Sequence, residues 1–136
     1  MDKTKLIIDL SIDEGIKLFP YTDSVGKTTI GTGRNLTDIG ISQAESNFML
    51  SNDINMAVTQ LNKSLPWWVT LSEPRQRVLC NMCFNLGISK LLSFANTLSF
   101  IKTGDYQHAA EAMLNSTWAK QVGKRAQRLA QIMKEG

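Results

Sequence analysis

The sequence lacks the features that mark a membrane-spanning or exported chain. Its apolar runs are only a few residues long, far shorter than the roughly 20 residues that a helix needs to cross a bilayer. The opening segment, residues 1–9, is interrupted by Asp9 and has no small-residue cleavage site after it, unlike a secretory signal. We therefore expect no membrane-spanning segment and no export signal of the chain's own.

Cysteine and histidine are too scarce for most metal sites. Cys80 and Cys83 have the C-x-x-C spacing, but no alternation of strands and helices surrounds them as in redox folds. A metal site would need more such ligands, and His108 is the only histidine. We expect two reduced, partly buried thiols, and neither a metal nor a cofactor.

Charge is divided unevenly along the chain. Residues 1–70 carry six Lys and Arg against eight Asp and Glu, whereas residues 71–136 carry nine against four. The net charge of the whole chain is +3. The basic C-terminal half predicts an anionic partner, and charge alone leaves both nucleic acid and a cell-wall polymer open.

The hydrophobic pattern predicts a predominantly helical α+β fold. Apolar residues recur at helical spacing over residues 3–13, and Gly15 is a natural helix stop. The alternation in residues 27–32 is typical of a β-hairpin or small sheet. Ser42 and Glu45 form a capping box that opens a connecting helix, about residues 42–63. Further helices are expected over residues 72–86, 89–92, 95–102, 106–114 and 123–134.

These elements predict one domain, residues 1–136, made of two lobes. The N-terminal lobe covers about residues 12–45 and contains the sheet, and the C-terminal lobe covers about residues 66–136. We expect the helix over residues 3–13 to pack on the C-terminal lobe. Two lobes joined by one helix form a cleft, where binding sites are common.

Two acidic residues suit the hydrolysis of a glycosidic bond, which needs one protonated and one ionised carboxyl group. Glu14 lies at the C-terminal end of its helix, where the negative end of the helix dipole favours the protonated form. Asp23 lies in a polar loop beside Thr22 and Ser24, which favours the ionised form. Taken alone, the pair also fits a surface glutamate and an aspartate that stabilises a turn.

Three short motifs strengthen the first interpretation because their spacing is fixed. Asp23 follows Glu14 by nine residues, and Thr29 follows Asp23 by six, within the strings Asp13-Glu14-Gly15, Tyr21-Thr22-Asp23 and Thr28-Thr29-Ile30-Gly31-Thr32-Gly33. This pattern resembles the signature of the phage-type lysozymes, glycoside hydrolase family 24. The resemblance implies that Glu14 is the general acid, that Asp23 and Thr29 hold the attacking water, and that the anomeric carbon is inverted.

The resemblance extends into the C-terminal half. Asn81, Phe84, Gly87 and residues 94–98 look like the segment that lines the cleft in that family, and Ala109-Ala110, Trp118 and residues 124–128 look like its closing helices. By this resemblance Gly33, Phe84 and Thr97 bind substrate, and Arg125 pairs with the catalytic glutamate.

The chain departs from the family pattern at two places. The T-even phage member has His where this chain has Arg34, so any structural ion pair at that position takes a different form here. Residues 35–37 also run almost directly into the capped helix at Ser42, which predicts a smaller N-terminal lobe and a more open cleft.

The resemblance implies a muramidase of the endolysin type. It would hydrolyse the β-1,4 bond between N-acetylmuramic acid and N-acetylglucosamine in peptidoglycan glycan strands, as a monomer without a nucleic-acid or membrane partner. It would remain in the host bacterial cytoplasm until a holin-type pore released it. Two alternatives stay open: a lysozyme fold that only binds wall material, and a small basic helical module that binds nucleic acid.

Overall fold

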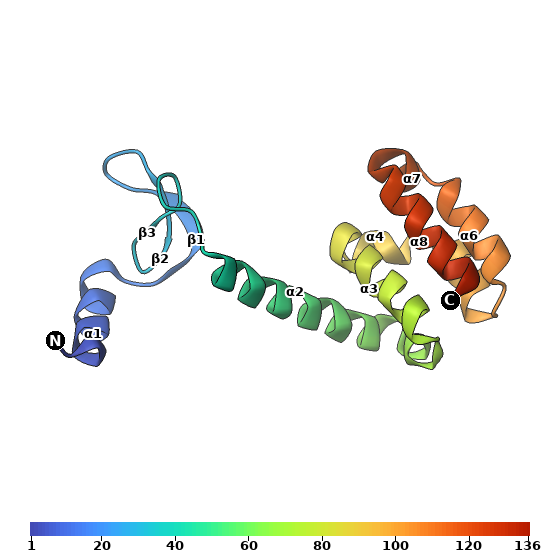
Figure 1. Cartoon of the computed structure of the whole chain (residues 1–136), viewed down its shortest axis with the longest axis horizontal. Coiled ribbons are helices and arrows are strands. Elements are labelled where there is room, and N and C mark those ends of the chain that lie inside the picture. Colours follow the sequence, from blue (N-terminus) through green and yellow to red (C-terminus); the bar gives the residue numbers. More distant parts are fainter. The chain divides into compact units, whose positions relative to one another are not determined.

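The computed structural model describes all residues, Met1–Gly136, and the chain divides into two compact units, Met1–Phe48 and Met49–Gly136. Figure 1 labels the elements: a helix and three short strands in the first unit, and helices in the second. This confirms the predicted α+β class, predominantly helical with a small sheet near the N-terminus. The predicted lobe boundaries and the packing of the first helix stay predictions.

Helix α1 (Lys3–Glu14) opens the first unit. The side chain of Asp2 caps its start by accepting a hydrogen bond from the amide of Lys5 at 3.1 Å. The helix ends because Gly15 adopts a φ of +70°, a conformation in which only glycine is unstrained. The amide of Gly15 still donates to the carbonyl of Ser11 at 3.0 Å. The prediction of a helix that stops at Gly15 is therefore confirmed, and Glu14 is its last residue.

The sheet consists of β1 (Lys17–Thr22), β2 (Thr28–Gly31) and β3 (Arg34–Asn35), antiparallel in that order. At the hairpin turn Thr22 pairs with Thr28, whereas at the far end Lys17 pairs with Gly31. The register therefore shifts along β1, in the stretch that contains Pro20, which has no amide hydrogen to donate to the ladder. The predicted hairpin is confirmed, and the two-residue β3 is too short for a sequence pattern to show.

An ion pair joins β3 to the start of α2 (Gln43–Ser64). Arg34 Nη1 lies 2.8 Å from Glu45 Oε1 and 3.1 Å from the carbonyl oxygen of Gly40. Glu45 Oε1 also accepts the amide of Ser42 at 3.0 Å, and Ser42 Oγ accepts the amide of Glu45, which confirms the predicted capping box. Arg34 and the Ser42 hydrogen bonds lower the pKa of Glu45 to about 2.

The second unit continues from α2 into a set of shorter helices. They are the 3₁₀ helix η1 (Pro66–Thr70), α3 (Glu73–Leu86), α4 (Ile88–Leu92), α5 (Ala95–Lys102), α6 (Tyr106–Leu114), α7 (Thr117–Val122) and α8 (Lys124–Glu135). All the helices predicted in this half are present, within about one residue at each end. Sequence reasoning missed η1 and α7. At α7 the signals were a cap at Ser116 and a stop at Gly123, but six residues are too few to show helical periodicity. No helix of the chain is both long enough and apolar enough to cross a membrane.

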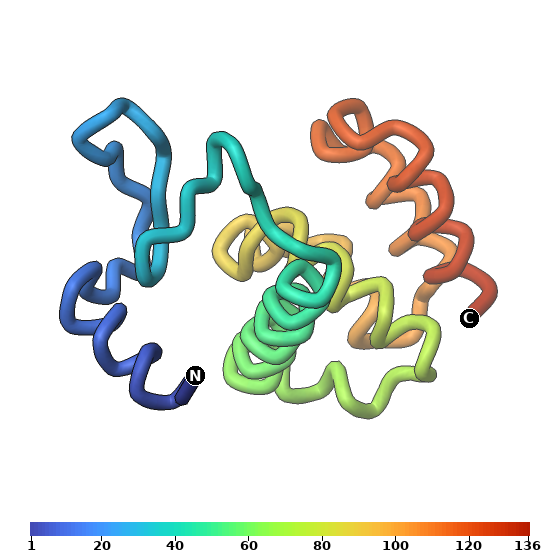
Figure 2. The backbone as a smooth tube through the Cα atoms, turned by 60° about the vertical axis from the view of Figure 1, so that its left-hand side comes forward, coloured from blue at the N-terminus to red at the C-terminus, as the bar shows by residue number.

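The hydrophobic core lies in the second unit. Helix α6 packs against both α5 and α8, and Figures 1 and 2 show it running beside α8. Trp68 and Trp118 are buried, and each indole N–H donates to an asparagine, Asn62 at 2.7 Å and Asn85 at 2.8 Å. The largest fully buried side chains are Leu61, Val78, Leu79, Met82, Leu91, Ile101, Met113 and Met133.

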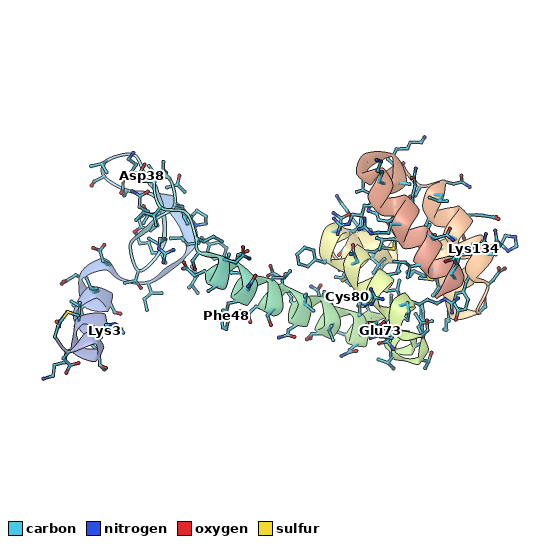
Figure 3. The ribbon with its side chains drawn as sticks, viewed as in Figure 1. Lys3, Asp38, Phe48, Glu73, Cys80 and Lys134 are labelled. Atoms are coloured by element: carbon cyan, nitrogen blue, oxygen red, sulfur yellow. The ribbon has the colours of Figure 1, made fainter.

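Both cysteines are free thiols on α3, and Figure 3 labels Cys80. Cys83 is buried and its Sγ lies 3.8 Å from Gln60 Oε1 of α2, whereas Cys80 is half-buried. Burial raises the pKa of both thiols, and the neighbouring Cys80 raises that of Cys83 further. The two side chains therefore behave as small apolar groups at neutral pH.

Truncation of the core tests this packing. Leu79→Ala removes a side chain that is 0% exposed, so we expect it to lower the free energy of unfolding by about 2–5 kcal/mol. Leu114→Ala makes the same chemical change where the side chain is 46% exposed, and it should cost less than about 1 kcal/mol. Denaturant unfolding of both variants measures the difference, and equal losses would contradict this assignment of the core.

The Arg34–Glu45 pair predicts a specific pH dependence. The pKa of Glu45 is about 2 in the folded chain and 4.5 without its partners. A lowered folded-state pKa stabilises the fold above the unfolded-state value, and this stabilisation disappears as the pH falls from 4.5 toward about 2. The difference in unfolding free energy between the wild type and Glu45→Gln should therefore shrink over this range. Glu111→Gln, an exposed control on α6, should show no matching change.

Candidate active site

The predicted catalytic residues Glu14, Asp23 and Thr29 all lie in the first unit. The side chain of Glu14 lies against the turn from β2 to β3. Glu14 is exposed at the end of α1, and its side chain takes part in no hydrogen bond or ion pair within the protein. Its carboxyl group lies over Gly33: a β-carbon at Gly33 would come within 3.1 Å of both Cδ and Oε2 of Glu14. Gly33 has a φ of +75°, so both its backbone and the close approach require glycine.

Asp23 is held by the turn between β1 and β2. Its Oδ1 accepts the amides of Val25 at 3.0 Å and Lys27 at 2.8 Å, and its own amide donates to the carbonyl of Lys27 at 2.9 Å. The turn-stabilising role that sequence alone left open is therefore real. It uses only one carboxylate oxygen, because Oδ2 accepts no hydrogen bond from the protein. Asp23 can serve the turn and still present an acceptor.

Thr29 lies on β2 and is the one buried side chain of the first unit, at 4% exposure. Its Oγ1 donates to the carbonyl of Lys27 at 3.1 Å. The backbone of Lys27 is therefore hydrogen bonded to both predicted residues. Its amide donates to the Asp23 carboxylate, and its carbonyl accepts from the Thr29 hydroxyl. Sequence reasoning missed this role because it belongs to backbone atoms.

Glu14 and Asp23 are associated with different turns of the sheet. Gly33 follows the Gly31 end of β2, whereas Asp23 lies beyond the Thr28 end, and no hydrogen bond links Glu14 to Asp23 or Thr29. The intervening stretch of β2 is only Thr28–Gly31, which spans roughly 10 Å at about 3.3 Å per residue. Because the register shifts along β1, this six-residue strand pairs with the four-residue strand β2. The Glu14 carboxyl group thus contacts the turn that follows β2, and Asp23 lies in the turn that precedes it.

The remaining predicted residues lie in the second unit, around two separate pockets. Arg125 of α8 donates through Nε and Nη2 to Asn81 Oδ1 of α3, at 3.0 and 2.7 Å. These two side chains and Phe84, which is 46% exposed, line a pocket of about 400 Å³. The structure therefore brings Arg125 and Phe84 together. The predicted pairing of Arg125 with the catalytic glutamate stays a prediction.

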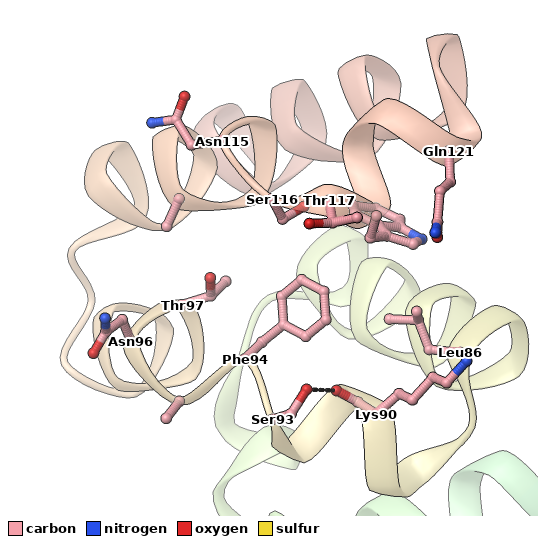
Figure 4. Close-up of a pocket in the computed structure, with 13 residues that line it drawn as sticks. Leu86, Lys90, Ser93, Phe94, Asn96, Thr97, Asn115, Ser116, Thr117 and Gln121 are labelled. Carbon is pink, nitrogen blue, oxygen red and sulfur yellow. Dashed lines mark hydrogen bonds between the residues drawn. The ribbon is translucent and has the colours of Figure 1, made fainter.

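Thr97 lines the second pocket, which we call the Thr97 pocket (Figure 4). Its volume is about 680 Å³, and the ring of Phe94 meets Trp118 edge-on, with centroids 6.2 Å apart. Sequence reasoning missed several lining residues because they come from separate helices and turns, and no local motif connects them. The lining consists of Leu86, Lys90, Ser93, Phe94, Ala95, Asn96, Thr97, Ala112, Asn115, Ser116, Thr117, Trp118 and Gln121.

Comparison with known proteins identifies a family and several relatives of this chain. Residues 11–133 match the model of the family described as phage lysozyme. The chain is similar to "Probable T4-type lysozyme 2" and "Probable T4-type lysozyme 1" of Dictyostelium discoideum, with 29% and 28% identity, and in each case the match covers 93% of this chain and 92% of the relative.

A third relative is much longer than this chain. The "Pre-baseplate central spike protein Gp5" of Enterobacteria phage T4 is 26% identical over 91% of this chain, but the match covers only 26% of that protein. The family match spans all of the predicted catalytic positions and both pockets. It favours the hydrolase over the nucleic-acid-binding alternative. The chain belongs to the phage lysozyme family, whose members are glycoside hydrolases of the lysozyme (muramidase) type that act on the bacterial cell wall.

Proposed function

We propose that this chain hydrolyses the β-1,4 glycosidic bond between N-acetylmuramic acid and N-acetylglucosamine in peptidoglycan, with Glu14 as the general acid. The observation that carries this proposal is the placement of the Glu14 carboxyl group against the bare backbone of Gly33. A carboxyl group in that position has a fixed support on one side and no competing partner in the protein. It is therefore available to give its proton to the leaving sugar oxygen.

Asp23 and Thr29 suit the binding of the attacking water. The Thr29 hydroxyl already donates its proton to the carbonyl of Lys27, so only its lone pairs remain for a further hydrogen bond. Asp23 Oδ2 is likewise only an acceptor while the carboxylate is ionised. A water that donates one proton to each oxygen would direct a lone pair at the sugar, and Asp23 would take up the proton that it loses.

The family resemblance favours an inverting course. Inversion needs space for a water between the base and the sugar, and the carboxyl groups of inverting enzymes lie about 6.5–9.5 Å apart. We propose from this resemblance a single displacement by water rather than a covalent sugar–enzyme intermediate.

We propose further that Gly33, Phe84 and Thr97 bind substrate and that Arg125 supports the site. The Thr97 pocket offers hydroxyl and amide groups together with aromatic edges, which suits N-acetylated sugars and the peptides attached to them. The bidentate contact with Asn81 fixes the Arg125 guanidinium in place. We also propose, from the family resemblance, a monomer that reaches the wall from the host cytoplasm through a holin-type pore.

Removal of the proposed proton donor tests the mechanism. Glu14→Gln keeps the size of the side chain but cannot donate a carboxyl proton, so we expect kcat on purified peptidoglycan to fall by about 10²–10⁴-fold. Asp13→Asn removes an exposed carboxylate one residue away on the same helix and should retain activity within about twofold. Turbidity loss and the release of reducing sugar ends measure both variants. Similar activity in wild type and Glu14→Gln would refute the role of Glu14, and no activity in either would favour a wall-binding protein.

Gly33→Ala tests the support of the carboxyl group. The new methyl group would meet Glu14 at 3.1 Å and displace it, so we expect kcat to fall by about tenfold or more. The positive φ adds a stability cost of about 1–2 kcal/mol.

Gly40→Ala is the matched control for backbone strain. Gly40 has a φ of +65°, but a methyl group added there would have no atom within 4 Å. The variant should lose comparable stability and keep its kcat. Equal losses of kcat in the two variants would show that strain, rather than contact with Glu14, explains the effect.

A further inference from the structure

The Thr97 pocket contains one charged side chain, that of Lys90. Lys90 belongs to α4, and Figure 4 shows its side chain extending along the pocket wall past Leu86, on the same side as Gln121. No aspartate or glutamate lines the pocket. The ammonium group of Lys90 takes part in none of the ion pairs of the chain, whose cations are Lys27, Arg34, Arg77 and His108. The pocket therefore carries a positive charge without an internal partner.

The position of Lys90 in its helix explains only part of this arrangement. A cation near the end of a helix is favourable because the last carbonyl groups carry partial negative charge. That effect would hold equally well if Lys90 pointed away from the pocket. The other polar groups of the pocket are neutral, with amides at Asn96, Asn115 and Gln121. Such a lining, neutral donors and acceptors around one cation, suits a ligand with amide groups and one anionic group.

We infer that Lys90 is a specificity-determining residue that binds a carboxylate of the peptide attached to the muramic acid of the wall polymer. The inference rests on the proposed function, since it assigns the Thr97 pocket to part of the peptidoglycan substrate. The carboxyl group of muramic acid is used in the amide bond to the peptide, so the sugars of a peptide-bearing strand have no free carboxylate. The peptide itself carries both amides and carboxylates. An ammonium group is a compact point charge and can meet a carboxylate without a fixed geometry.

Two forms of one substrate test this inference. Soluble glycan oligomers that carry their peptides are compared with the same oligomers after the peptide carboxyl groups have been converted to neutral amides, and kcat/KM is measured for each. Lys90→Gln should lower kcat/KM about two- to fivefold on the unmodified form, the size expected for an exposed ion pair, and leave kcat/KM on the amidated form unchanged. Lys90→Arg should retain most of the wild-type value. Lys102→Gln removes an exposed lysine outside the pocket and should match the wild type on both forms.

Salt gives a second measurement that needs no variant. The preference of the wild type for the unmodified form over the amidated form should weaken as ionic strength rises from about 0.05 to about 0.5 M, because salt screens an exposed charge pair. An unchanged kcat/KM of Lys90→Gln on the unmodified form, or an equal loss on both forms, would overturn the role of Lys90. Failure of the wild type to cleave either form would instead overturn the proposed function.

Discussion

Hydrogen bonds to backbone groups, rather than a hydrophobic core, hold two of the three candidate catalytic residues, Asp23 and Thr29, in place. The first unit has a single buried side chain, that of Thr29, and it is polar. The geometry around it depends on the two peptide groups of Lys27, which bind Asp23 on one side and Thr29 on the other. Because a hydrogen bond fixes distance and direction within narrow limits, these contacts define positions that loose apolar packing would leave variable.

This arrangement gives the two carboxyl groups different freedom. Asp23 is tied down by two amides through one oxygen, so the position of the other oxygen follows from the turn. Glu14 makes no such contacts and is limited only by the surface of Gly33. A fixed acceptor suits the placement of a small water molecule, and a carboxyl group with some freedom suits a leaving oxygen that moves as the bond breaks. The different freedom of the two carboxyl groups follows from local backbone structure alone.

Much of this structure could be predicted from the sequence, and the limits have physical causes. The capping box at Ser42, the stop at Gly15 and the long helices were visible because caps, glycines and periodic apolar residues are local signals. Glu14, Asp23 and Thr29 were predicted as catalytic residues from the fixed spacing of three short motifs. The contact of Glu14 with Gly33 and the Thr97 pocket were not visible, since both arise between segments that no local pattern connects.

Arg34 shows how a departure from the family pattern is accommodated. The sequence indicated only that an arginine replaces a histidine, and the structure gives it Glu45 as a partner. Glu45 was recognised from sequence as a helix cap, and its second role appears only when β3 and the start of α2 come together.

The thiols on α3 have a consequence for the environment in which such an enzyme works. A cell wall lies outside the reducing interior of the cell, where exposed thiols are oxidised or join in mixed disulfides. Oxidation starts from the thiolate, and burial keeps Cys80 and Cys83 in the protonated form. The raised pKa values of Cys80 and Cys83 therefore slow their oxidation in such a space.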